Sequence, residues 1–97
     1  MKRTDSQSIG AILRAFFQDN PRIADKLAEA RLLDYWNNRM NRTVSKYTTE
    51  TFIRNRVLYV KVTSSVLKNE LMMNRQNLIE KLNAEAGRNV IDNFFLI

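Results

Sequence analysis

The middle of this chain is a strand-forming segment set between two flanks with helical periodicity. From Thr43 to Arg54 it is rich in threonine, tyrosine, valine and phenylalanine, which favour strands. Asn55-Arg56 then predicts a hairpin turn. From Val57 to Thr63 apolar and polar residues alternate, with Leu58 and Val60 on the same face. We therefore expect a β-hairpin with one apolar face, against which helices pack.

The first flank predicts two helical regions. Its apolar positions define an amphipathic helix from about Ser6 to Gln18. Asp19-Asn20-Pro21 ends this helix and starts another, because asparagine caps helices and proline suits their first position. The next apolar positions do not fit one straight stripe, so we expect a break near Glu29 to Arg31. Asn41 then predicts a turn, because asparagine tolerates the left-handed conformation.

The last third predicts a helix and a strand. Thr63-Ser64-Ser65 supplies helix caps, and a long helix follows from there to about Ala86. Gly87 sits where a left-handed C-terminal cap belongs. Val90 to Leu96 predicts a final strand, which a right-handed crossover places parallel to a hairpin strand. We expect one α+β domain over residues 1–97, with N-terminal helices, a β-hairpin, a long helix and a final strand in a three-stranded mixed sheet.

The charge of the chain is concentrated in the same middle segment. The net charge is +6, yet the segments before Trp36 and after Lys61 are close to neutral. Between them a single acid, Glu50, stands against six bases, namely Arg39, Arg42, Lys46, Arg54, Arg56 and Lys61. Such a surface attracts polyanions, most commonly phosphate backbones. The alternative is a set of solvated charges that protects an exposed strand edge.

A few further side chains are candidates for binding. Tyr59 and Lys61 share the polar face of the central strand, where an aromatic ring beside a base can stack on a nucleobase. Phe16 and Phe17 lie 100° apart on a helix, so one of them is a candidate for an exposed interaction patch. Arg75 falls within an apolar stripe, either as a stem packed on the core or as a contact to a partner.

The missing residue types narrow the functional classes. The chain has no cysteine and no histidine, so it lacks the usual zinc ligands and the commonest general base. We expect a protein that is not an enzyme and that holds no metal or cofactor. No apolar run approaches the roughly 18 residues of a membrane span, and no signal sequence is recognisable at the start. We therefore expect a cytoplasmic protein that does not enter membranes.

Several segments together resemble the DciA family. They are Leu27 to Trp36, the strand Leu58 to Ser65 that ends in Val-Thr-Ser-Ser, Glu70-Leu71, Leu82-Asn83 and Gly87. The resemblance extends over nearly the whole chain from Ile9. It implies a KH-like domain that binds DNA and works with the replicative helicase, which such proteins help to load onto DNA.

The sequence also departs from the family pattern. Asn41 occupies the turn after the tryptophan, which usually contains glycine, and Tyr47 stands where a histidine is common in the following strand. The zinc ribbon associated with some members is absent, because there is no cysteine. Longer members continue into a disordered basic extension that contributes to DNA and helicase binding, whereas this sequence stops at Ile97.

Two functional hypotheses remain open at this point. The first is a nucleic-acid-binding adaptor that binds DNA with low sequence specificity through the basic segment and Tyr59, and contacts the replicative helicase through Phe16, Phe17 and Arg75. The second is a protein-interaction module, a homodimer or a binder of an acidic partner, without nucleic-acid contact. The salt dependence of oligonucleotide binding distinguishes them.

Overall fold

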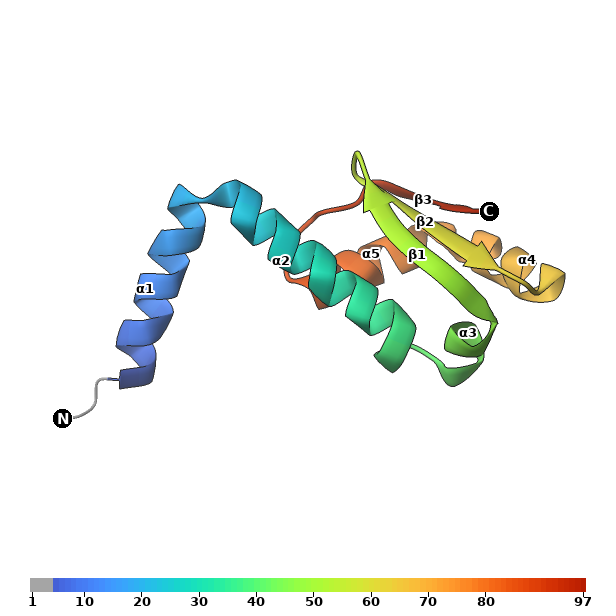
Figure 1. Ribbon diagram of the computed structural model, residues 1–97, viewed down its shortest axis with the longest axis horizontal. Helices are drawn as coiled ribbons and strands as arrows, with labels where there is room; N and C mark the ends of the chain where they lie inside the picture. The colour runs from blue at the N-terminus through green and yellow to red at the C-terminus, as the bar shows by residue number, and fades with distance from the viewer. Residues whose placement is uncertain (1–4) are drawn as a thin grey trace.

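The computed structural model describes residues 5–97 and shows an α+β fold with a three-stranded mixed sheet (Figure 1). The elements follow in the order α1 (Asp5–Asp19), α2 (Pro21–Asp34), a π-helical turn η1 (Tyr35–Arg39), α3 (Arg42–Tyr47), β1 (Thr48–Arg54), β2 (Val57–Val62), α4 (Ser65–Met73), α5 (Arg75–Ala86) and β3 (Asn93–Leu96). The predicted α+β class and the three-stranded mixed sheet are confirmed. Within the described residues, no helix has the length and apolarity that a bilayer crossing requires.

The sheet has β2 at its centre. It pairs antiparallel with β1 and parallel with β3, so the predicted hairpin and the parallel final strand are both confirmed. The hairpin turns at Asn55 and Arg56, whose φ angles of 52° and 64° are both positive. This is the backbone geometry whose twist matches two antiparallel strands.

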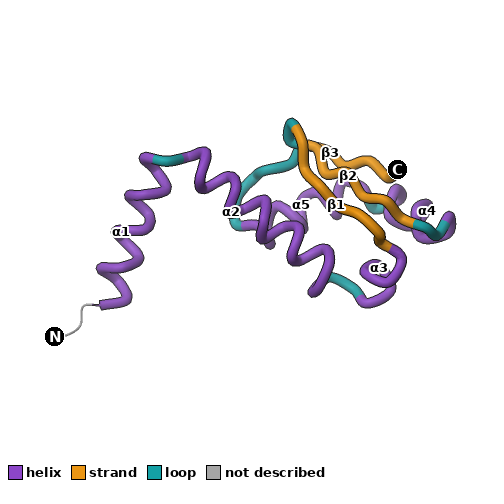
Figure 2. The backbone as a smooth tube through the Cα atoms, in the orientation of Figure 1, coloured by secondary structure: helices purple, strands orange, loops and turns teal. Residues whose placement is uncertain are grey.

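Helices cover one face of the sheet and enclose the core. Leu58 and Val60 of β2 point into it, together with Phe94 of β3, and all three are fully buried. Leu32 of α2 and Trp36 of η1 close the core from the helical side. In Figure 2 the three strands lie side by side at one end of the molecule, with α1 at the other. The predicted alternation along β2 is confirmed.

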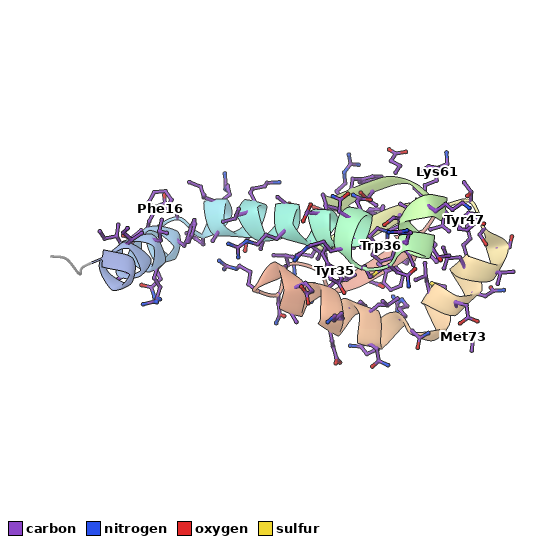
Figure 3. All side chains as sticks on the ribbon, turned by 90° about the horizontal axis from the view of Figure 1, so that it is seen from below. Phe16, Tyr35, Trp36, Tyr47, Lys61 and Met73 are labelled. Atoms are coloured by element: carbon purple, nitrogen blue, oxygen red, sulfur yellow. The ribbon has the colours of Figure 1, made fainter. Side chains whose placement is uncertain are left out.

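The indole of Trp36 links η1 to the start of the hairpin. Its Nε1 donates a hydrogen bond to Thr48 Oγ1 at 3.1 Å, and that hydroxyl donates in turn to the Val44 carbonyl at 2.7 Å. Figure 3 shows Trp36 between the helical layer and the strands. A buried tryptophan needs a partner for its N–H, and this one is satisfied.

The predicted start of the first strand is wrong. We expected strand from Thr43, but Arg42–Tyr47 is the helix α3 and β1 begins at Thr48. Asn41 is extended, with φ of −165°, and its side-chain oxygen accepts hydrogen bonds from the backbone N–H groups of Thr43 and Val44. It therefore caps a helix and does not make the left-handed turn that we expected. Burial of Val44 overrides the strand preference of the segment.

The predicted break near Glu29 to Arg31 is also wrong, because α2 continues to Asp34. Its buried positions are Ala24, Ala28 and Leu32, followed by Trp36 after another four residues. A strict spacing of four drifts around a helix of 3.6 residues per turn, and the wider η1 turn absorbs that drift. The irregularity thus lies at η1, one turn later than we expected.

The predicted long helix is divided at Asn74. This residue has φ of −107° and ψ of 22°, and its backbone N–H bonds to the Leu71 carbonyl, which ends α4. Its side-chain Nδ2 donates to the Glu70 carbonyl at 3.0 Å. Asparagine disfavours helix interiors because its amide competes for backbone groups in this way. Ser64 caps α4 by accepting from the Leu67 N–H, as predicted.

The loop between α5 and β3 is fixed by Gly87 and Asn83. Gly87 ends α5 with φ of 91°, the left-handed cap that we predicted. The amide of Asn83, which is only 8% exposed, donates to the Ile91 carbonyl and accepts from the N–H groups of Val90 and Ile91 at 2.9 to 3.1 Å. The last strand begins at Asn93, shorter than the predicted Val90 to Leu96 because this loop is held by a side chain.

The first helix projects from the domain. Among the described residues α1 packs mainly against the start of α2 and leads away from the sheet (Figure 1). The radius of gyration is 16.1 Å, above the value of about 12.5 Å that a compact chain of this length would have. Among the described side chains of α1, four large apolar ones stay exposed, namely Ile9, Ile12, Leu13 and Phe16.

Candidate nucleic-acid interface

Basic side chains lie at both ends of the β-hairpin. Arg42 and Lys46 belong to α3, which leads into β1, and Lys61 lies near the same end on β2. Arg54 is the last residue of β1, beside the turn. Lys61 pairs in register with Glu50, four residues from Arg54 along β1, which corresponds to roughly 13 Å of strand. The structure therefore spreads the predicted bases along the hairpin.

Four of these bases are available to a polyanion. Their side chains are exposed, and no acid whose side chain the structure describes lies within ion-pair distance of them. The four are Arg42, Lys46, Arg54 and Lys61, and we call them the hairpin cations. The ammonium group of Lys46 lies 5.6 Å from the centroid of the Tyr47 ring.

Arg39 is held within the protein. Its guanidinium lies 3.4 Å from Asp34 and 3.8 Å from Glu85, and 5.5 Å above the ring of Tyr35. These contacts attach η1 to α5. The hypothesis that Arg39 binds nucleic acid remains a prediction, but these contacts turn the residue toward the helices.

Arg56 also has a protein partner. Its Nε and Nη2 donate to the two carboxylate oxygens of Asp92 at 2.9 and 3.0 Å, and its Nη1 donates to the Asn89 carbonyl at 3.2 Å. The hydrogen bonds raise the pKa of Arg56 above its usual value and lower the pKa of Asp92 below its own. Together they tie the hairpin turn to the loop before β3. The predicted nucleic-acid role of Arg56 would compete with this tie.

The outer face of the sheet carries a row of aromatic side chains. Phe52, Tyr59 and Phe95 are register partners across β1, β2 and β3, and we call them the aromatic row. Tyr59 and Lys61 share this face, as the alternation along β2 predicted. Sequence reasoning missed Phe52 and Phe95, because only the strand register shows that they join Tyr59.

The residues predicted to bind a partner do not form one surface. Phe16 is 45% exposed on α1, whereas Phe17 is half-buried and meets it edge to face, with ring centroids 5.6 Å apart. Arg75 starts α5 at its junction with α4 and is half-buried. Phe16 lies on the projecting helix, away from the sheet (Figure 3). Arg75 thus belongs to a different part of the molecule.

The described residues offer no set of metal ligands. No three histidine, cysteine, aspartate or glutamate side chains gather within residues whose side chains the structure describes. The buried polar side chain Asn83 has its hydrogen-bonding groups satisfied by backbone partners. The candidate binding features of the described residues are the hairpin cations, the aromatic row and the exposed apolar face of α1.

A comparison with known protein families identifies the family to which this chain belongs. The model for "Dna[CI] antecedent, DciA" matches residues 8–94. The chain belongs to the DciA family. Comparisons with curated proteins and with solved structures give no match. DciA membership implies a role related to loading the replicative helicase.

The residues that carried the resemblance to the DciA family are mainly structural. Trp36 is fully buried, Asn83 fixes the loop before β3, and Gly87 ends α5 in a left-handed conformation. Tyr47 lies at the end of α3, not in the strand where we expected it. These residues shape the fold, so the binding surface must be argued from this chain's other side chains.

Proposed function

We propose that this DciA-family domain is a non-enzymatic, cytoplasmic adaptor that binds DNA and contacts the replicative helicase. The observation that carries the DNA-binding proposal is the hairpin cations, four exposed bases without an ion-pair partner among the described side chains. Ordinary surfaces mix both signs of charge, whereas this hairpin contributes one acid, Glu50. Family membership supports the connection to replication.

The chemistry of these side chains favours contact with the backbone of the nucleic acid. The hairpin cations lie near the ends of strands and on the short helix α3, where lysine and arginine side chains can contact phosphates. Phosphate contacts position a nucleic acid without specifying its sequence. Each neutralised phosphate releases counterions. The proposed binding is therefore weak in specificity and steeply dependent on salt.

The proposal is tested with charge reversal at the two ends of the hairpin. Oligonucleotide affinity, measured by fluorescence anisotropy over a series of salt concentrations, should give a log–log slope of about −3 for four phosphate contacts. Arg54→Glu with Lys61→Glu should weaken binding and flatten the slope by at least about 1.4. Arg56 is left unchanged because its loss would also break the tie to Asp92.

A matched control carries the same change in net charge elsewhere. Arg22 and Arg31 lie exposed on α2, so Arg22→Glu with Arg31→Glu should leave most of the affinity and the slope unchanged. Equal losses in the two double variants would mean that net charge alone drives binding. Parent-like binding by the hairpin variant would refute the interface.

The second candidate function is a protein-interaction module without nucleic-acid contact. The exposed apolar side chains of α1 favour it, because such a stripe usually packs against a partner. It predicts a concentration-dependent change of mass in sedimentation, lost on Ile12→Asp, with no oligonucleotide binding at low salt. The same stripe also serves the proposed adaptor, as its surface for the helicase.

A further inference from the structure

The aromatic row has a geometry that the sheet itself does not require. Phe52 and Tyr59 stack at a centroid distance of 4.9 Å with their planes 17° apart, and Tyr59 and Phe95 follow at 6.0 Å with a tilt of 44°. Three rings on three neighbouring strands thus form a continuous strip across the outer face. Both ends of the strip lie on edge strands, since the strand order is β1-β2-β3.

The core packs on the other side of the sheet and leaves this strip exposed. Leu58, Val60 and Phe94 alternate with the aromatic row and are fully buried under the helices. Phe52 and Tyr59 are half-buried and stack on each other, whereas Phe95 is 45% exposed. Cross-strand pairing explains the contact between Phe52 and Tyr59. It does not explain the third ring, Phe95, which is tilted against Tyr59 and remains exposed at one end of the aromatic row.

Cations flank the strip on the same face. Arg54 and Lys61 each lie two residues along a strand from the aromatic row, one on either side, or roughly 7 Å away. Figure 3 shows Lys61 on the strand side of the molecule, opposite Met73 of α4. Glu50, the register partner of Lys61, is the one acid on the three strands. The rings in the middle of this face match the nucleobases of a single nucleic-acid strand, and the positive charges on either side match its phosphates.

We propose that the aromatic row is a stacking site for unpaired bases of single-stranded DNA, with Phe95 as the ring that a base covers first. This inference rests on the proposed DNA binding and specifies the form of its substrate. Every base has a flat face that can extend a stack of rings, whereas duplex bases are already stacked and paired. A second copy of the chain laid on this face would bring Arg54 and Lys61 close to like charges.

The test distinguishes stacking on nucleobases from contact with phosphates. Affinity is measured for a thymine oligonucleotide, for an abasic oligonucleotide of the same length, and for a duplex. We expect the thymine strand to bind tightest. Phe95→Ala should weaken its binding by about 5- to 150-fold, the range given by alanine substitution at base-stacking rings. The abasic strand should bind Phe95→Ala and the parent equally.

Phe16→Ala is a matched control, because Phe16 is 45% exposed on α1, the same fraction as Phe95. It should change none of the three affinities. Phe95→Leu keeps an apolar side chain but removes the ring, so it should lose affinity for the thymine strand while keeping the parent's urea midpoint. This second variant distinguishes loss of stacking from loss of fold.

The outcomes are distinguishable from failure of DNA binding itself. Equal binding of thymine and abasic strands, with no effect of Phe95→Ala, would overturn the stacking site and leave DNA binding through the hairpin cations in place. No binding of any strand at low salt would overturn both proposals. A parent that is dimeric in sedimentation and becomes monomeric as Phe95→Ala, with unchanged DNA affinity, would make the row a self-association surface and would also overturn the stacking site.

Discussion

At the scale of single residues, one amide determines where the last strand lies. Asn83 satisfies three backbone groups of the segment that leads from α5 into β3. Without it, the N–H groups of Val90 and Ile91 and the Ile91 carbonyl would be buried without partners. Val90 and Ile91 are themselves core residues, so this loop cannot move out to water without exposing apolar surface.

Asn83→Ala should therefore destabilise the fold by about 2 to 4 kcal/mol, because each buried unsatisfied group costs roughly 1 to 3 kcal/mol. Urea unfolding followed by circular dichroism measures the loss. Asn77→Ala is the control, since Asn77 is exposed on the same helix and alanine favours helix. Equal midpoints for the two variants would show that the amide does not hold the loop.

A second residue-scale contact makes stability depend on pH. Hydrogen bonds from Arg56 lower the pKa of Asp92 in the folded protein. A lowered carboxyl pKa stabilises the fold above the unfolded value of about 3.9, and this contribution is lost as the pH falls through the folded pKa. Both groups are exposed, so the contribution is small.

Asp92→Asn should lower the urea midpoint at pH 7, and its difference from the parent should shrink as the pH falls below about 4. In a background of Arg56→Gln the same substitution should have little effect at either pH, which is the control. A difference that stays constant from pH 7 to pH 3 would contradict a role for the ionised carboxylate.

At the scale of elements, the sequence predicts what local patterns encode. The alternation along β2 predicts its buried and exposed faces, and Asn55-Arg56 and Gly87 mark the backbone positions that need positive φ. The errors arise where tertiary contacts decide. Thr43 to Tyr47 has strand-like composition, yet the Asn41 cap and the burial of Val44 make it a helix. The apolar stripe that predicts one long helix continues across Asn74, so it does not indicate that this helix is divided into α4 and α5.

The interface was predictable only in part for the same reason. Charge counting along the sequence finds all six bases but not the acids that face them across the fold. Arg56 meets Asp92, which lies 36 positions later, and Arg39 meets Glu85. Phe95 joins Tyr59 only through the register of β2 with β3. Local patterns thus identify the right segment, while long-range pairing selects the residues available for binding.

At the scale of the whole molecule, the two proposed surfaces are well separated. The molecule extends 56 Å along its longest axis, with the sheet at one end and α1 at the other (Figure 1). The apolar stripe of α1 is exposed over Ile9, Ile12, Leu13 and Phe16, and a helix with one apolar face gains stability by packing that face against a partner. Family membership makes the helicase the partner to test.

We therefore predict that DNA and helicase bind independently. Ile12→Ala with Phe16→Ala should weaken binding of the same organism's replicative helicase, measured by calorimetric titration, by about tenfold or more, because exposed apolar anchors carry much of such an interface. DNA affinity should be unchanged. Arg54→Glu with Lys61→Glu should weaken DNA binding and leave the affinity for the helicase unchanged. The opposite outcome would be loss of helicase binding on charge reversal of the hairpin, with helicase binding kept by the α1 variant. In that case the helicase and the DNA would compete for one surface. The apolar face of α1 would then be a contact between copies of the chain.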